Sequence, residues 1–404
     1  MRFLFLSAPL PGHLDWGGYL ATAIELQRRG HEILWASGQA VAPRLKHANI
    51  PFHLLHETGW RWPPPPPLQP QPGLSPTTIQ QLRAERALDQ WLDEVRVSQA
   101  CSEIIELGHA YQPTLLISEM FVSAAGLAAE VLGVPFAVAG WPAMQPKVAS
   151  DNAGLISMAR ARLQRLLTQF SISGRNWTTS GPPALCSPIL HLTYWSPSWY
   201  RGVALLPQTH HVGGRARETI APPPAWPADN PWVFITLGTS FGDDLNFFIA
   251  AARAATELGG LPVLALGGQL APAQRQVLQD QLPGAVIIEE MLDLDRVLPH
   301  VAAAIHHGGA GTTHALITHG VPQIIVPHAA DQGYQAQGVA RSGIGIALAA
   351  KETTIPRLVS GLAQLLPDLS PYRTQAQQLR ADFAALGGVQ TAATLLSEAA
   401  DQKR

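Results

Sequence analysis

The stretch from residue 301 to residue 338 constrains the fold more than any other part of this chain. The apolar run Val301–Ile305 predicts a buried strand, and the glycines at 308, 309 and 311 predict a tight turn that leads into a helix near residue 312. A second apolar run, Pro322–Val326, follows that helix and precedes a polar loop. Strand, helix and strand in this order predict a parallel α/β sheet.

Two loops of this stretch have the chemistry of a ligand site. The start of a helix leaves backbone N–H groups unbonded and therefore attracts anions, and His307 stands at the mouth of the predicted turn. The second loop offers the carboxylate of Asp331 and the amide of Gln332, which suit hydroxyl groups. Because both loops follow strands of a parallel sheet, we expect them at its carboxyl edge, where such sheets bind ligands.

Length and composition exclude several classes of protein. A chain of 404 residues suits two domains rather than one core. With 14% charged residues and a net charge of −2, it has no electrostatic footprint for nucleic acid. Two cysteines are too few for a disulfide framework, and no run of about 18 uncharged apolar residues predicts a membrane span. We therefore expect a cytoplasmic protein with small or apolar partners.

The amino-terminal half repeats the alternation of strands and helices. It predicts a long helix at Thr77–Leu107 and strands at Arg2–Ser7, His31–Ala36, Pro51–Leu55, Leu115–Ser118, Pro135–Val138, Ile189–Thr193 and Val203–Leu206. The loop after the first strand contains His13. An imidazole, with a pKa of about 6.5, suits the removal of a proton from a hydroxyl at neutral pH. His13 is therefore a candidate general base, and the competing interpretation is a hydrogen bond within its own loop.

A histidine that acts as a base is normally oriented by a carboxylate on its other ring nitrogen. Two carboxylates compete for this role. Glu119 directly follows the strand Leu115–Ser118, and Asp15 lies two residues after His13. Asp15 has at least as strong a claim to be the N-cap of the helix that begins near Trp16. We expect Glu119 to be the partner.

The carboxy-terminal half begins with the strand Trp232–Leu237, which leads into the turn Gly238, Thr239 and Ser240. A glycine turn between a strand and a helix can approach a phosphate. A connector rich in turns and prolines, from about residue 207, precedes this strand, so we divide the chain into domains at 1–220 and 221–404. Asp293 and Asp295 have the spacing of a metal motif but suit a helix cap better, and we expect no metal site.

Three segments together resemble a known signature. HHGGAGTT, then GVPQIIVP, then ADQ are similar to the donor-binding element of the GT-B nucleotide-sugar glycosyltransferases, the family that includes macrolide, glycopeptide and plant natural-product glucosyltransferases. Gly12-His13 resembles the start of that family's GHxxP element, although Trp16 replaces the proline. The resemblance implies an α/β fold of two Rossmann-like domains that face each other across a cleft. It also implies a C-terminal helix that crosses back to the first domain.

The resemblance implies roles for particular residues. His13 is the general base, and Glu119 supports it at a position where the family usually has Asp. Two further sets are implied. The donor-binding set is Gly238, Thr239, Ser240, Met291, Leu292, His307, Gly309, Gly311, Thr312, Asp331 and Gln332, and the acceptor-binding set is Trp16, Trp60, Trp62 and Trp141. Plant members hold the ribose with a Glu where this chain has Ala315, so UDP and dTDP both stay open.

The function expected from these features is an inverting, metal-independent transfer of a hexose or deoxyhexose from a UDP- or dTDP-sugar to a small lipophilic acceptor of secondary metabolism. No cofactor is expected, because the nucleotide sugar is a co-substrate. We expect no nucleic-acid partner and at most transient contact with a membrane surface. Two alternatives keep the fold: a nucleotide-sugar epimerase or hydrolase, and a non-catalytic nucleotide-sugar-binding subunit.

Overall fold

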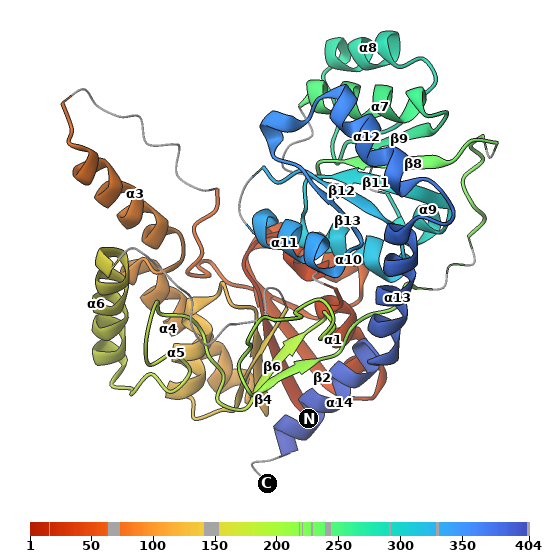
Figure 1. Ribbon diagram of the computed structural model, residues 1–404. Coiled ribbons are helices and arrows are strands. Elements are labelled where there is room, and N and C mark those ends of the chain that lie inside the picture. Colours follow the sequence, from red (N-terminus) through yellow and green to blue (C-terminus); the bar gives the residue numbers. More distant parts are fainter. Residues whose placement is uncertain are drawn as a thin grey trace. The chain divides into compact units, whose positions relative to one another are not determined.

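The computed structural model describes residues 1–15, 17–63, 73–140, 153–217, 219, 221–227, 229–238, 244–290, 292–328 and 331–401. The chain folds into two compact units, and Figure 1 labels many of their helices and strands. Unit 1 comprises Met1–Tyr194, Val203–Val212 and Val389–Arg404, and unit 2 comprises Trp195–Gly202 and Gly213–Gly388. Within the described part of the chain, no helix is both long and apolar enough to span a bilayer.

Unit 1 contains a parallel sheet whose described strands follow the order β3-β2-β1-β4-β5-β6-β7. These strands are β1 (Arg2–Leu6), β2 (Glu32–Ser37), β3 (Phe52–Leu54), β4 (Leu115–Ser118), β5 (Phe136–Ala139), β6 (Leu190–Thr193) and β7 (Thr209–His211). The helices are η1 (Pro11–Asp15), α1 (Tyr19–Arg28), η2 (Gln39–Val41), α2 (Ala42–His47), α3 (Pro76–Trp91), α4 (Glu94–Tyr111), α5 (Ser123–Val131), α6 (Ala153–Phe170) and α14 (Val389–Asp401). The strand order reverses between β1 and β4, so the loops after these two strands frame the usual ligand position of such a sheet.

Unit 2 contains a second parallel sheet, with the order β10-β9-β8-β11-β12-β13. Its strands are β8 (Trp232–Thr236), β9 (Leu261–Ala265), β10 (Val286–Ile288), β11 (Val301–His306), β12 (Gln323–Ile325) and β13 (Gly345–Ala347). Its helices are α7 (Leu245–Glu257), α8 (Pro272–Gln281), α9 (Leu294–Val297), η3 (Leu298–His300), α10 (Ala310–His319), α11 (Gln332–Ser342), η4 (Ala350–Glu352), α12 (Ile355–Leu365) and α13 (Pro371–Ala385). Here the order reverses between β8 and β11. Two parallel sheets of this kind confirm the predicted α/β class.

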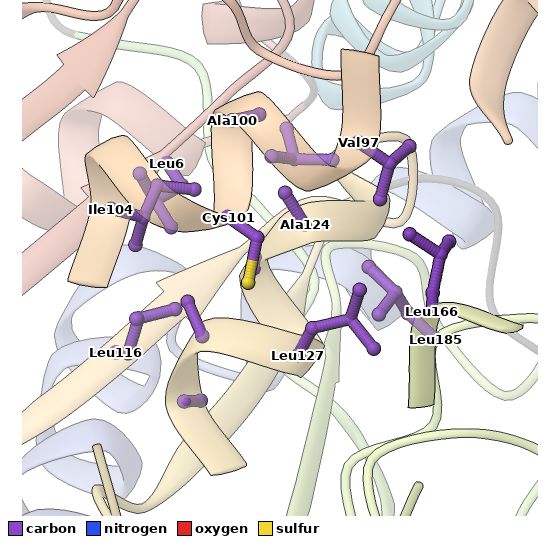
Figure 2. Packing of buried hydrophobic residues seen from close by; sticks show 14 of the residues in the cluster. Leu6, Val97, Ala100, Cys101, Ile104, Leu116, Ala124, Leu127, Leu166 and Leu185 are labelled. Atoms are coloured by element: carbon purple, nitrogen blue, oxygen red, sulfur yellow. The ribbon is translucent and has the colours of Figure 1, made fainter. Parts of the chain in front are cut away.

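An apolar core covers one face of the first sheet. Figure 2 shows Leu6 and Leu116 from the central strands packed with Cys101 of α4, Leu127 of α5 and Leu166 of α6. Burial raises the pKa of the Cys101 thiol to about 12, so this cysteine is a packing residue rather than a nucleophile. The core anchors the strand ends from which the loops of unit 1 emerge.

The second sheet is buried on both faces. Alternate residues of β8 belong to different clusters: Val233 and Ile235 pack toward α7 and α12, whereas Trp232 and Phe234 pack with Val297 and Leu316. This alternation follows from the period of two residues in a strand. It explains why β8 and β11 are continuous apolar runs, as strands covered on both sides must be.

Two expected elements of unit 1 were wrong. The helix expected at Thr77–Leu107 is divided into α3 and α4, because the carboxylate of Asp93 accepts the backbone N–H of Arg96 at 3.0 Å and starts a new helix. Val203–Leu206 is not a strand. The strand that pairs with β6 is instead the polar segment β7, Thr209–His211.

The segment Trp195–Gly202 belongs to unit 2, although it comes from the amino-terminal half of the sequence. Its central residue Trp199 is fully buried, and the guanidinium of Arg341 donates to the Trp199 carbonyl at 3.0 and 2.8 Å. The hydroxyl of Ser198 donates to the Asp382 carboxylate at 2.6 Å. The indole lies against Gly338, where an added Cβ would be 2.1 Å from Trp199 Cζ2. The absence of a side chain at Gly338 of α11 therefore leaves room for the Trp199 ring.

Replacing Gly338 by Ala should destabilise the protein by about 1–3 kcal/mol, because the new methyl group overlaps the Trp199 ring. Gly333 in the same helix offers a matched control, since a Cβ added there would meet nothing within 4 Å. Gly333→Ala should be neutral or stabilising by up to about 1 kcal/mol. Denaturant unfolding of both variants measures the difference. Equal stability would contradict the tight contact.

Candidate functional site

An imidazole and a carboxylate meet at the carboxyl edge of the first sheet. His13 Nδ1 lies 2.8 Å from Glu119 Oε2, and the Glu119 side chain is fully buried whereas that of His13 is 15% exposed. The other carboxylate oxygen of Glu119 accepts the backbone N–H of Ala8. At this separation the carboxylate favours the neutral tautomer that carries its proton on Nδ1 and its lone pair on Nε2.

The sheet register explains how residues so distant in sequence come together. Leu6 and Ser118 are register partners on the adjacent parallel strands β1 and β4. The chain leaves both strands at the same edge, so Glu119 stands directly beside the loop that carries His13. The expected contact between these two residues is present in the structure. The side chain of the competing Asp15 and all of Trp16 lie outside the described residues.

Aromatic rings extend this site. The ring of Phe121 lies against that of His13, with centroids 5.2 Å apart, and Trp60 contacts Phe121 edge-on at 4.8 Å. Trp60 is one of the four tryptophans expected to bind an acceptor, whereas Phe121 was missed although it follows Glu119 by only two positions. Trp62 is 52% exposed. Trp141 lies outside the described part of the chain.

The glycine turn of unit 2 has the geometry of an anion site. β11 ends at His306, Gly309 is the N-cap of α10, and the first intrahelical bond runs from the Thr313 N–H to the Gly309 carbonyl at 2.9 Å. The N–H groups of residues 310–312, which include the predicted Gly311 and Thr312, therefore precede the first intrahelical bond. Such groups, together with the helix dipole, favour negative charge at this point.

His307 is held between two glycine backbones. A Cβ on Gly238 would lie 2.7 Å from His307 Cε1, and a Cβ on Gly309 would lie 2.6 Å from His307 Nε2. Burial, and to a smaller extent the electrostatic effect of the neighbouring His328, lowers the pKa of His307 to about 4, although a hydrogen bond with the Thr236 backbone opposes the shift. The ring is therefore neutral at pH 7. The expected residues Gly238, His307 and Gly309 are brought together in one contact.

The second predicted loop begins α11. β11 and β12 are neighbours with His306 and Ile325 in register, so the loops that follow them share one edge of the sheet. Gln332 is buried, and its Oε1 accepts the backbone N–H of His328 at 2.7 Å, which fixes the loop itself. Asp331 is the N-cap residue of α11. Leu292 follows β10 at the same edge, and the predicted Thr239, Ser240 and Met291 lie outside the described residues.

Asp293 and Asp295 of unit 2 have structural roles. The carboxylate of Asp293 accepts the Asp295 N–H at 3.2 Å and caps α9, and Asp295 pairs with Arg217 at 2.7 Å. Among the residues that the structure describes, no group of three His, Cys, Asp or Glu side chains is placed to hold a metal ion. The expected independence from metals stays a prediction.

A pocket of about 880 Å³ lies elsewhere in unit 2. It is lined by the end of α10, by η3 and by α13, next to the amino end of β11. The glycine turn is at the opposite end of that strand. Arginines of this pocket bond to backbone carbonyls, as Arg373 does with Ala302 and Arg296 with Pro222. The pocket is therefore separate from the glycine turn.

Comparisons with known proteins agree with this fold. Residues 269–396 match the family model for the C-terminal domain of erythromycin biosynthesis protein CIII-like proteins. Glycosyltransferase GtfC of Amycolatopsis orientalis is 25% identical over 448 residues, which cover 100% of this chain and 99% of the relative. The 4'-demethylrebeccamycin synthase of Lentzea aerocolonigenes is 26% identical over 439 residues, with 98% of each chain covered.

Solved structures match over nearly the whole chain. CalG4, the calicheamicin glycosyltransferase, superposes with a TM-score of 0.77 at 21% identity, covering 99% of this chain and 98% of its own. The spinosyn rhamnosyltransferase SpnG, complexed with thymidine diphosphate, has a TM-score of 0.70 at 22% identity, covering 98% and 99%. The protein is therefore a glycosyltransferase of the GT-B type. Its relatives and structural neighbours are antibiotic glycosyltransferases of this type, which confirms the predicted resemblance, fold and enzyme class.

The unfolding free energy should fall as the pH is lowered from about 6.5 toward 4. The pKa is about 3 for His306 and about 4 for His307 in the folded chain, below their ordinary value, so the unfolded chain takes up protons first. Between these pKa values, each histidine lowers the free energy of unfolding by up to about 1.4 kcal/mol for each pH unit of acidification. Above about pH 6.5 neither histidine has this destabilising effect.

Denaturant titrations at pH 7, 6 and 5 measure this slope. His307→Asn should make it shallower, and replacing the exposed His47 of α2 by Asn should leave it unchanged. An identical slope in the wild type and the His307→Asn variant would show that burial of this ring is not what limits stability in acid.

Proposed function

We propose that this protein is an inverting, metal-independent glycosyltransferase that moves a hexose or deoxyhexose from a dTDP- or UDP-sugar to a hydroxyl of a small lipophilic acceptor. The observation that carries the proposal is the 2.8 Å contact between His13 Nδ1 and the buried carboxylate of Glu119. It supports a base role for His13, because the carboxylate both orients the ring and stabilises the imidazolium that forms when the ring takes a proton.

The proposed reaction is a direct displacement. His13 Nε2 takes the proton of the acceptor hydroxyl while the hydroxyl oxygen forms a bond to the anomeric carbon of the sugar. The bond from that carbon to the nucleoside diphosphate breaks in the same step, and the diphosphate leaves with the electron pair. No covalent sugar–enzyme intermediate is involved, so the configuration at the anomeric carbon inverts.

The diphosphate is proposed to bind at the start of α10. The early N–H groups of this helix and the neutral ring of His307 face the charge that develops on the leaving group. Fixed donors of this kind stabilise an oxyanion without reorganisation and can replace a metal ion. We include Gly238, Leu292, Asp331 and Gln332 in the proposed donor site, the last two for the sugar hydroxyls. No cofactor takes part, because the nucleotide sugar is a co-substrate.

A dTDP-sugar is the first donor to test. The related fold of SpnG binds thymidine diphosphate, which lacks the ribose 2′-hydroxyl of UDP. Plant members of the family that this chain resembles hold the ribose with a Glu at the position of Ala315 on α10, and Ala315 has no carboxylate to bind that hydroxyl. A UDP-sugar stays the second choice.

The acceptor is proposed to bind beside the aromatic rings of unit 1. Phe121 and Trp60 give the surroundings of His13 an apolar wall, which suits a lipophilic molecule with one reactive hydroxyl. The names of CalG4 and SpnG specify calicheamicin and spinosyn, so an antibiotic-like natural product is the class to screen. The near-neutral net charge supports small-molecule partners rather than nucleic acid, and we propose a cytoplasmic protein with at most transient contact with a membrane surface.

His13→Ala should abolish sugar transfer and leave nucleotide binding intact, because unit 2 holds the proposed nucleotide site. Glu119→Gln should lower kcat by about 10²–10⁴-fold, because His13 loses the carboxylate that orients its ring and stabilises the imidazolium, and should change the Kd for the donor less than about threefold. Glu106→Gln, an exposed change on α4, is the control and should behave as wild type.

Transfer rates by mass spectrometry and donor titrations measure these effects. Consumption of donor without an acceptor, at a rate that His13→Ala does not change, would favour a hydrolase or epimerase. Nucleotide binding by the wild type without transfer to any acceptor would favour a non-catalytic subunit. Either result would contradict the proposed transferase.

A further inference from the structure

His306, the first of the two adjacent histidines before the glycine turn, has a different environment from His307. His306, the last residue of β11, is fully buried. Its Nδ1 accepts the backbone N–H of Gly308 at 3.1 Å, and its Nε2 lies 2.8 Å from Oε1 of Gln323. Both ring nitrogens are therefore occupied by contacts inside unit 2, and the ring has no part in binding a ligand directly.

These two contacts fix the tautomer of His306. Because Nδ1 accepts an N–H, it carries no proton, and the proton of the neutral ring must be on Nε2, from which it is donated to Gln323 Oε1. Burial lowers the pKa of His306 to about 3, with the neighbouring His307 adding to the effect. A protonated ring could not accept the Gly308 N–H, so the low pKa keeps this bond in place at physiological pH.

The imidazole connects the turn to the neighbouring strand. Gln323 is the first residue of β12 and is fully buried. Gly308 has a φ of 93°, and a Cβ at this position would lie 2.7 Å from Ile325 Cδ1 of the same strand. The turn thus runs close to β12, and the hydrogen bond to His306 fixes the peptide that precedes Gly308. The following residues lead directly into the first turn of α10.

We propose that His306 is a positioning residue that holds the glycine turn in its anion-binding shape before the donor arrives. The inference rests on the proposed role of this turn in binding the donor diphosphate. Fixed N–H donors bind an anion more tightly than mobile ones, because less order has to be created on binding. Without the ring acceptor, the Gly308 N–H becomes a buried donor without a partner, and the turn rearranges to solvate it.

Two substitutions separate the two contacts of the ring. The Oδ1 of Asn can occupy the place of Nδ1 and accept the Gly308 N–H, whereas the amide of Gln reaches the place of Nε2 and approaches Gln323. His306→Asn should therefore keep the Kd for thymidine diphosphate within about threefold of wild type. His306→Gln should raise that Kd about 10- to 100-fold, the range expected when a buried donor loses its acceptor.

Calorimetric titration of the full chain with thymidine diphosphate, and with UDP, is the test. Thermal unfolding of both variants is recorded alongside, because a purely structural role would lower stability without the difference in affinity between Asn and Gln. Gln323→Leu provides a second variant, at a residue of β12 outside the turn. This change removes the acceptor of the Nε2 proton, so the ring is no longer restricted to the tautomer that accepts the Gly308 N–H. Binding of thymidine diphosphate should weaken about three- to tenfold.

The outcomes are distinct. Weaker binding by His306→Gln than by His306→Asn, with an unchanged acceptor KM, supports the inference. Equal affinities for the two variants, or a wild-type Kd in both, overturn it while leaving the donor site in place. If the wild type binds neither nucleotide, the proposed function of the turn fails, and the inference fails with it.

Discussion

The charge of a departing diphosphate is the physical constraint on which this account depends. Breaking the bond between a sugar and a nucleoside diphosphate leaves negative charge on phosphate oxygens, and some positive or dipolar group has to meet it. In unit 2 the group proposed for this role is the start of α10, where β11 ends and a glycine turn leaves backbone N–H groups without intrahelical partners. His307 packs between Gly238 and Gly309, so a larger residue at either glycine would have to displace its ring.

His13, His306 and His307 have three different environments, which suggests that they have three different roles. His13 is partly exposed and faces a buried carboxylate, as a base requires. His307 is buried, has a pKa of about 4 and stands as a neutral group at the mouth of a helix. His306 is enclosed completely, with both nitrogens in contact with protein groups. In the proposed scheme, burial and hydrogen-bond partners, rather than residue type, assign proton transfer to His13, diphosphate binding to His307 and support of the turn to His306.

Much of the fold and part of the site could be predicted from the sequence. Parallel strands end at a common edge, so the positions of His13 and Glu119 after their strands were enough to predict their contact. The interruption at Asp93 was missed because the apolar period continues across it, although the capping side chain was visible. Phe121 was missed because ring packing depends on tertiary structure. β7 was misplaced because pairing with β6, rather than β propensity, decides which segment of that connection becomes a strand.

The product of a single transfer reaction tests the central claim most directly. The reaction would use an α-linked dTDP-sugar, an acceptor identified by its gain in mass, and excess chelator, with the anomeric configuration read by NMR. Direct displacement aided by His13 and by the start of α10 predicts a β-linked product, formed at the same rate with and without chelator. An α-linked product, or activity that requires an added divalent metal, would contradict the account.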